Sequence, residues 1–310
     1  MPEKKFNIGV IGTNDDAWKN LVRLVRNHPQ FGLTYLVDAT SRKYNQTPPS
    51  GLDLIFISLP PDASPAFVDK IGPRTRIVDL GTDFCGENTE WVDGLADIYP
   101  DRIRGQTRVI VPGCYFTGAL IALAPILVPK KMEWRHENLI SHSSSGVTGA
   151  DISSETDEQS AGHSKVASDC SNVDHFHAKE MGRLIECLSG GCQDSSPKSH
   201  SPLIHLSSVN LTTCFLEGSL DAEVCFGLAQ DFYKNNPLVR VSIRPAHKEK
   251  VDGSNLAVIS YASPPQETVA FSSIARHGKG GAGHAIQNAN LMLGLEANMG
   301  LTGAIVAPKS

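Results

Sequence analysis

The chain has 310 residues, which is long enough for two domains with separate cores. Its 40% hydrophobic and 20% charged residues are typical of a globular protein, and its net charge of -5 gives no support for a nucleic-acid or membrane-surface partner. No apolar run approaches the roughly 18–20 residues that a membrane helix needs, and the start leads into a strand without a signal-peptide pattern. Seven irregularly spaced cysteines favour reduced thiols, and hence a cytoplasmic location, over a disulfide framework.

The first hundred residues alternate strands with helices. Apolar runs predict strands over 5–13, 33–38, 52–59 and 75–80, and helical periodicity predicts helices over 18–26 and 63–71. This alternation implies an α/β fold with a doubly wound parallel sheet of the Rossmann type. Such sheets bind ligands at the carboxyl ends of their strands, and a dinucleotide is the natural ligand.

The loop after the first strand departs from a glycine-rich nucleotide loop. Gly12, Thr13 and Asn14 are followed by Asp15 and by Asp16-Ala-Trp18, so Gly12 is the one glycine in place. Glycines let the backbone approach a pyrophosphate, whereas carboxylates cap the following helix and repel it. We therefore expect a nucleotide site that is modified or weakened.

Three residues after the second strand, Ser41, Arg42 and Lys43, have the chemistry to meet a 2′-phosphate. They favour NADPH over NADH. An ordinary pair of surface cations is the alternative interpretation.

Cys114 is the centre of the predicted chemistry. Residues 109–111 form a short apolar strand, Pro112-Gly113 break it, and 118–127 predict a buried helix interrupted near Pro125. A thiol at the turn into a helix meets unpaired N–H groups and the positive end of the helix dipole, which should lower its pKa. An inert buried cysteine is the alternative.

The second half predicts a mixture of strands and helices. A strand over 139–149 runs into a Ser/Gly loop, 151–172 and 190–201 predict loops, and a helix opens near residue 175. Further strands are predicted over 203–210, 214–225, 238–243, 256–262 and 269–274, a helix over 227–235, and a closing helix from the 279–288 segment to about 299.

The residues around Cys114 resemble a known active site. Pro112-Gly-Cys-Tyr115, with Thr117-Gly118 and Pro125 behind, is similar to the signature of the N-acetyl-gamma-glutamyl-phosphate reductase family, within the wider semialdehyde dehydrogenase group. The resemblance covers roughly residues 6–301. It implies a dinucleotide-binding domain over 1–114, an α+β catalytic and dimerisation domain with a mixed sheet over 115–277, and a C-terminal helix over 278–310 that returns to the first domain.

The resemblance also assigns roles around the thiol. Cys114 would be the nucleophile, and His177 the acid/base with Glu180 orienting it, since positions three apart share a helix face. Either His175 or His177 fits the acid/base role. Zinc binding by His-x-His and solvent-exposed histidines are the alternatives, but no third and fourth zinc ligand stands at standard spacing, so no metal is expected.

Further family segments supply substrate and cofactor contacts. Ser145 and Gly146, with His175 and Glu217, would contact substrate. Ser58, Pro60, Gly149, Lys279, Gly280 and Asn288 would contact the cofactor. Glu217-Gly218 stands near the place of a family Arg-Gly that meets a substrate carboxylate, and Asn210-Leu211 near that of a His-Leu. Because glutamate reverses the charge of arginine, an altered substrate is plausible.

The function that the resemblance implies is NADPH-dependent reduction of an acyl phosphate to its semialdehyde through a thioester, of the arginine-biosynthesis type. One alternative is a related reductase acting on another aminoacyl phosphate, held free or on a carrier protein. The other is a relative that keeps the fold as a non-catalytic scaffold. A homodimer or homotetramer is expected.

Overall fold

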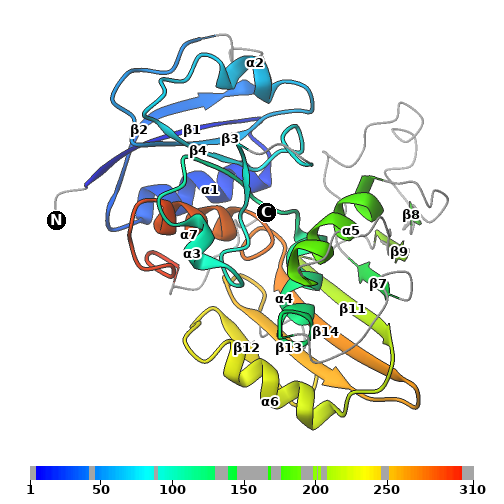
Figure 1. The fold of residues 1–310 in the computed structure, drawn as a ribbon. Helices are drawn as coiled ribbons and strands as arrows, with labels where there is room; N and C mark the ends of the chain where they lie inside the picture. The colour runs from blue at the N-terminus through cyan, green and yellow to red at the C-terminus, as the bar shows by residue number, and fades with distance from the viewer. Residues whose placement is uncertain are drawn as a thin grey trace. The chain divides into compact units, whose positions relative to one another are not determined.

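The structure is a computed structural model that describes residues 5–41, 46–86, 90–129, 139–144, 167–168, 176–189, 198–200, 202–203, 208–245 and 251–301. The chain divides into two compact units (Figure 1). One unit comprises Met1–Gly113 with His277–Ile305, and the other comprises Cys114–Arg276 with Val306–Ser310. Within the described ranges no helix is long and apolar enough to cross a membrane.

The first unit is built on a six-stranded parallel sheet. Its strands lie in the order β2-β1-β3-β4-β6-β5. They span Phe31–Asp38, Phe6–Gly12, Leu54–Ser58, Arg76–Asp79, Arg108–Ile110 and Val92–Asp93 in that order. The apolar runs of β1, β3, β4 and β6 are buried on both faces, as the sequence predicted for a doubly wound sheet, whereas the edge strands β2 and β5 are partly exposed.

Helices cover both faces of this sheet. They are α1 (Asp16–Asn27), α2 (Ser64–Val68), α3 (Pro100–Ile103) and α7 (Ala282–Met292), with a 3₁₀ turn, η1, over Ala39–Ser41. Figure 1 shows α1 and α7 on one face and α2 on the other. Because α7 packs against α1 and β4, the last helix of the chain completes the first unit.

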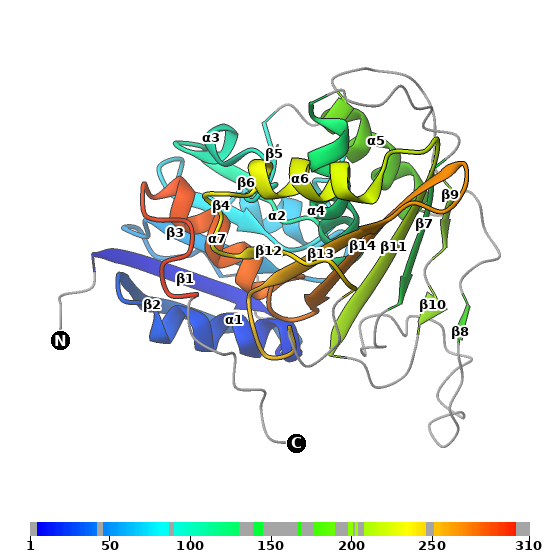
Figure 2. The same cartoon turned by 90° about the horizontal axis from the view of Figure 1, so that it is seen from below.

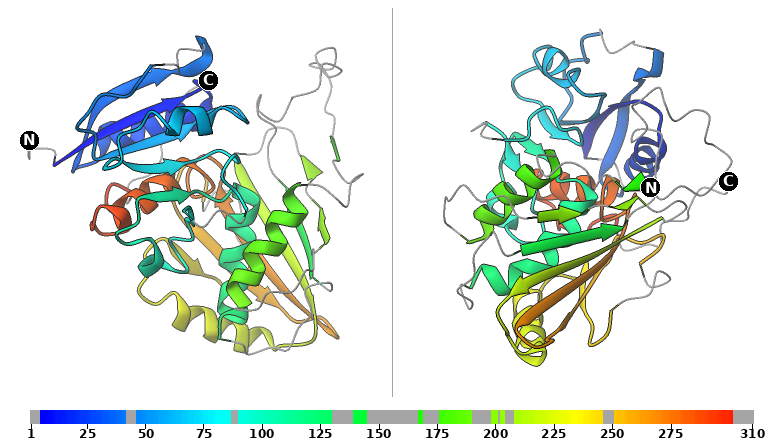
Figure 3. Two further views of the ribbon diagram at one scale, coloured as in Figure 1. Left: turned by 45° about the horizontal axis from the view of Figure 1, so that its top comes forward. Right: turned by 90° about the vertical axis from the view of Figure 1, so that its right-hand side faces the viewer.

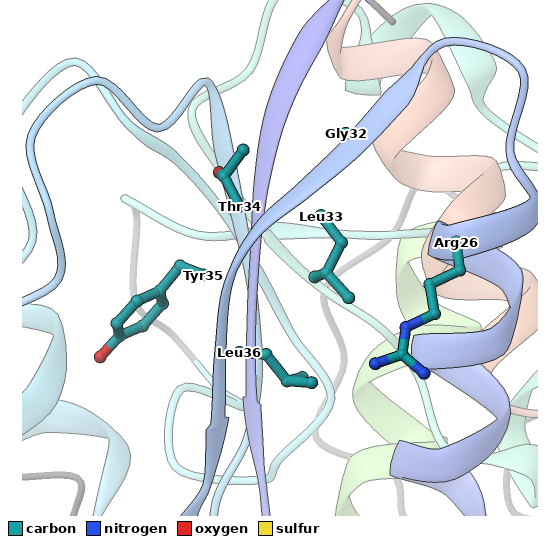
Figure 4. A pocket seen from close by; sticks show the side chains of 6 residues that line it. All are labelled: Arg26, Gly32, Leu33, Thr34, Tyr35 and Leu36. Carbon is teal, nitrogen blue, oxygen red and sulfur yellow. The ribbon is translucent and has the colours of Figure 1, made fainter. Parts of the chain in front are cut away.

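The second unit is built on a mixed sheet of six strands in the order β12-β13-β14-β11-β7-β9. These strands span Val239–Val241, Ala257–Ala262, Glu267–Ala275, Val209–Glu217, Leu139–Ser144 and Lys198–His200, and β8 (Ala167–Ser168) with β10 (Pro202–Leu203) forms a separate pair. Its helices are α4 (Cys114–Leu127), α5 (Phe176–Ser189) and α6 (Ala222–Phe232). The helices lie on one face of the sheet in Figure 2, and the green-to-orange strands run side by side in Figure 3.

Pro125 does not interrupt α4, which corrects the sequence prediction. A helical proline leaves the carbonyl four residues earlier without its N–H donor. Here that carbonyl, Ile121 O, accepts a hydrogen bond of 2.8 Å from the Tyr233 hydroxyl, and Ala122 O accepts one of 2.8 Å from Tyr261. The two tyrosines satisfy carbonyls in the apolar part of the helix, from Gly118 onward, so α4 continues to Leu127.

Several predicted elements differ from the structure in type or length, and the two segments predicted as loops, 151–172 and 190–201, contain the short strands β8 and β9. The strand predicted over 214–225 ends at Glu217, because Gly218 takes a φ of 105° and Asp221 caps α6 by accepting from Glu223 N at 2.7 Å. The closing helix ends at Met292 rather than near residue 299, because Gly294 takes a φ of 72°. The predictions did not include β5 and α3, which are too short to show a period.

Candidate active site

Five of the predicted cofactor residues, Gly12, Thr13, Asn14, Ser58 and Pro60, lie at the carboxyl edge of the parallel sheet. Gly12 pairs in register with Ser58 on β3 and with Asp38 on β2, while Thr13-Asn14 and Pro60 follow directly after their strands. The connection from β1 leads outward to β2, whereas the connection from its neighbour β3 leads to β4 in the opposite direction, so this edge is the topological switch point where such sheets bind ligands. Ser41 ends η1, and Arg42, Lys43 and Gly149 lie outside the described residues.

The loop after β1 does not fit a pyrophosphate in the manner of a glycine-rich loop. Asp15 caps α1, since its Oδ1 accepts from Trp18 N at 2.8 Å and its Oδ2 accepts from the Thr13 hydroxyl at 3.2 Å. A Cβ on Gly12 would lie 2.2 Å from Trp18 Cδ1, so the indole fills the space beside the one remaining glycine. The protein's own carboxylate takes the helix N-terminal donor that a phosphate would use.

Replacing Asp15 by serine should tighten NADPH binding about fivefold. Serine keeps an N-cap oxygen but removes a charge, and one unit charge about 4 Å from a phosphate costs about 1 kcal/mol in water. Nucleotide fluorescence titration measures the dissociation constant. Asp16→Ser, which removes an exposed carboxylate from the same helical turn, is the matched control. An Asp15→Ser protein with the affinity of wild type would show that this carboxylate does not oppose the nucleotide.

Asp38 is a candidate cofactor residue that the sequence reasoning missed. It is exposed at the end of β2, and its Oδ1 accepts from Thr40 N at 2.9 Å, while the Thr40 hydroxyl donates to Thr13 O at 2.9 Å. An acidic side chain at this position favours the ribose hydroxyls of NAD and repels the 2′-phosphate of NADP. Two features of the sequence could have identified Asp38: its spacing from Gly12 and its place at the end of the second predicted strand.

Asp79 is a buried carboxyl at the same edge, at the end of β4. Burial raises its pKa to about 7, and the neighbouring charge of Asp83 raises it further. Hydrogen bonds from Gly81 N–H and, at 3.5 Å, from the Ser64 hydroxyl act in the opposite direction and lower it. Its Oδ2 has no hydrogen-bond partner among the described residues. Asp83 itself accepts from Asp62 N and Ser64 N at 2.8 and 2.9 Å.

Asp79→Asn should therefore change how stability depends on pH. Because the folded-state pKa lies above the unfolded value, the native protein holds a proton that the unfolded chain releases. The free energy of unfolding should fall as pH rises from about 4 to about 7, by about 4 kcal/mol in total from this group. Urea unfolding across this range should show the fall in wild type, and the difference between wild type and Asp79→Asn should isolate it. Parallel curves would contradict the assignment.

Lys279 belongs to a buried cluster rather than to a cofactor contact, which corrects the sequence prediction. Its side chain is 0% exposed, and Nζ lies 2.7 Å from Asp97 and 2.7 Å from Gln287 Oε1. Gln287 Nε2 donates to Asp97 at 2.9 Å, and burial lowers the pKa of His284 to about 4, so its imidazole is neutral. Asn288 is also buried, with Nδ2 donating to Gly94 O at 3.0 Å. The cofactor roles of Gly280 and Asn288 stay predictions.

Cys114 is the first residue of α4 and is partly buried. It follows Pro112-Gly113 directly, so the thiol stands at the helix N-terminus as the sequence predicted. Helix α5 packs against α4 in the same unit and carries His177 in its first turn. The His177 side chain, and the whole of Ser145, Gly146 and His175, lie outside the described residues.

Glu180 has a partner that the sequence analysis did not name. Its carboxylate is 7% exposed and accepts two hydrogen bonds from Arg183, at 2.6 Å from Nη2 and 3.1 Å from Nε. A bidentate pair of this kind fixes both side chains. The orientation of His177 by Glu180 stays a prediction.

Glu217 is placed away from Cys114, which corrects its predicted substrate role. It is exposed at the far end of β11, opposite Glu267. The helix-facing side of β11 carries Asn210 and Thr212, and Gly118 of α4 lies so close that a Cβ there would be 2.8 Å from Thr212 Oγ1. At about 3.4 Å per residue, Glu217 is about 24 Å along the strand from Asn210.

Comparison with known proteins gives concordant results. Residues 114–275 match the family model described as "Semialdehyde dehydrogenase, dimerisation domain". Two relatives named N-acetyl-gamma-glutamyl-phosphate reductase, from Methylobacterium sp. and Bradyrhizobium sp. (strain ORS 278), are 32% and 31% identical, each over 98% of this chain and 99% of its own length. The structure of an aspartate semialdehyde dehydrogenase II from Vibrio cholerae covers 94% of this chain and is itself covered over 99% of its length, with a TM-score of 0.68 at 13% identity.

Proposed function

Because the chain belongs to the N-acetyl-gamma-glutamyl-phosphate reductase family of the semialdehyde dehydrogenases, we propose that it reduces an acyl phosphate to a semialdehyde through a thioester on Cys114. The position of Cys114 at the N-terminus of α4 is the observation that carries this proposal. Negative charge on the sulfur is stabilised there, since the backbone N–H groups of the first turn carry partial positive charge.

In the proposed acylation, the Cys114 sulfur attacks the acyl carbon and the bond from that carbon to the phosphate oxygen breaks. Phosphate leaves with the electron pair, and a thioester remains on the enzyme. Backbone N–H groups at the start of α4, which carry partial positive charge, would stabilise the oxyanion of the tetrahedral intermediate. His177 takes the thiol proton and gives it to the oxygen that becomes anionic when the thioester is reduced, since α5 and α4 pack together. It removes this proton again as the carbon–sulfur bond breaks, so that the neutral aldehyde leaves and the thiolate is regenerated.

The reduction half requires a hydride donor, which we propose to be NADPH. The family uses NAD(P), and Ser41-Arg42-Lys43 have the chemistry for a 2′-phosphate, whereas Asp38 favours NADH. The cofactor would bind at the carboxyl edge of the parallel sheet. There the side chain of Asp15 already accepts the backbone N–H at the start of α1 that a cofactor phosphate would otherwise use.

The proposed substrate is the N-acetyl-gamma-glutamyl phosphate of the relatives' name, which would give the protein a cytoplasmic role in arginine biosynthesis. A different aminoacyl phosphate, free or carrier-bound, is the second candidate, because at 31–32% identity the relatives' name specifies only their own acyl group. A homodimer or homotetramer is proposed from the dimerisation-domain match. Ile140 and Leu211, at 39% and 41% exposure on the sheet face opposite α4, supply apolar surface for it.

The second kind of function to consider is a non-catalytic scaffold. It is favoured by Asp15 and Trp18, which occupy the loop where a nucleotide would bind. Two measurements distinguish the reductase from the scaffold. NADPH and NADH are titrated into the protein, and the reverse reaction is then run with phosphate, N-acetylglutamate semialdehyde and the oxidised nucleotide. The proposal predicts nucleotide binding and phosphate-dependent nucleotide reduction. Binding without turnover favours another acyl group, and no binding of either nucleotide favours the scaffold.

A further inference from the structure

The face of the mixed sheet beneath α4 carries a polar patch where a core would normally be apolar. The patch consists of Ser143, Asn210, Thr212 and Ser272, each 0–2% exposed. Ser143 Oγ and Thr212 Oγ1 are 2.9 Å apart, and the Thr212 hydroxyl donates to Asn210 Oδ1 at 2.9 Å. Buried polar groups cost free energy unless they are paired, so a patch of this kind needs a reason.

Asn210 is only half satisfied within this patch. Its Oδ1 accepts from Thr212, but its Nδ2 has no hydrogen-bond partner among the described residues although the side chain is 0% exposed. A buried donor left unpaired costs about 1–3 kcal/mol. Such a donor is well explained if a ligand oxygen accepts from it.

The register of helix and sheet places Asn210 beneath the start of α4. Gly118 lies beside Thr212, which pairs across the sheet with Ser272. Four residues further along α4, the Ala122 carbonyl accepts from Tyr261, which belongs to the next set of paired residues on this face of the sheet. Four helical residues advance about 6 Å and two strand residues advance about 6.8 Å, so every fourth residue of α4 matches alternate residues of β11. The turn before Gly118 begins at Cys114, and the matching position two residues before Thr212 is Asn210.

We propose that Asn210 is a further catalytic residue of the Cys114 site, whose Nδ2–H donates a hydrogen bond to the oxygen of the acyl group bound there. As sulfur attacks the acyl carbon, this oxygen gains negative charge, and the amide stabilises it together with the N–H groups of α4. The amide keeps its proton throughout. The inference rests on the proposed function, because it takes Cys114 as the nucleophile.

Two reactions of one thiol test the proposal. Acylation of Cys114 by p-nitrophenyl acetate passes through an oxyanion, whereas alkylation by iodoacetamide does not. Asn210→Ala should slow acylation about 100-fold or more and leave alkylation within about twofold of wild type, as loss of one oxyanion donor does elsewhere. The near-isosteric Asn210→Leu, which offers neither an N–H donor nor a charge, should also slow acylation selectively and covers the case in which the alanine variant unfolds.

Ser141→Ala is the matched control, since Ser141 lies on the same sheet face but accepts its hydrogen bond from Cys214. It should leave both rates unchanged. Equal slowing of acylation and alkylation by the Asn210 substitutions would indicate a structural role and overturn the proposal, as would no slowing of either. If wild-type and Cys114→Ser proteins are acylated alike, Cys114 is not the nucleophile and the proposed function fails first, taking the Asn210 role with it.

Discussion

Cys114→Ser is expected to lower the rate of the phosphate-dependent reverse reaction by about 10⁴-fold or more, and to leave the dissociation constant for NADPH unchanged. A serine hydroxyl is a far weaker nucleophile than a thiolate without a dedicated base, and removal of a nucleophile costs up to about 10⁶-fold in other enzymes. Steady-state kinetics and nucleotide titration on the same preparation give both quantities.

Cys187→Ser is the matched control for this substitution. Cys187 is also partly buried and lies on α5 in the same unit, so it tests whether loss of any thiol harms the protein. Its activity should match that of wild type. Activity that survives Cys114→Ser would remove the nucleophile assignment, and a joint loss of activity and nucleotide binding would point to damage to the fold.

Lys279→Met should lower the free energy of unfolding of the first unit by about 3–5 kcal/mol. Burial alone would raise the pKa of Asp97, but the charge of Lys279 and the hydrogen bonds from Gln287 and Lys279 outweigh it and lower that pKa, so the carboxylate is charged in a dry interior. Replacing Lys279 leaves the buried charge of Asp97 without a compensating cation. Removing one partner of a buried ion pair in this way destabilises a protein strongly. Urea unfolding followed by tryptophan fluorescence is suitable, since Trp18 and Trp91 lie in this unit.

The exposed pair Lys19–Asp16, 3.8 Å apart, supplies the control, because Lys19→Met should change stability by less than about 1 kcal/mol. Adding Asp97→Asn to Lys279→Met should recover part of the loss by neutralising the stranded carboxylate. A Lys279→Met protein as stable as wild type would show that the cluster does not carry this charge.

The sequence was most informative where one physical preference dominated. Unbroken apolar runs such as Leu54–Ser58 can only be buried strands, and Asp15 had the position and chemistry of a helix cap, which the structure confirms. The prediction for 214–225 was wrong because apolar residues fill both a strand end and the helix that follows it. The predicted interruption at Pro125 was wrong because the carbonyl that the proline leaves without a donor is satisfied by Tyr233, more than a hundred residues away in the sequence.

The candidate site was predictable to the same extent. Cys114 could be singled out because Pro112-Gly113 mark the turn locally, and its place at the start of α4 follows from that. The contacts of Lys279 with Asp97 and the alignment of Asn210 with α4 depend on tertiary register, which no local pattern encodes. Glu217 was misplaced because nearness in sequence to Asn210 hides about 24 Å of extended strand.

The central claim is that the sulfur of Cys114 carries the acyl group, and intact-protein mass spectrometry after mixing with N-acetyl-gamma-glutamyl phosphate, without any nucleotide, tests it most directly. We predict one covalent acyl adduct per chain, released by hydroxylamine, mapped to the peptide that contains Cys114 and absent from Cys114→Ser. An adduct of equal yield in Cys114→Ser, or an adduct on another cysteine, would contradict the account.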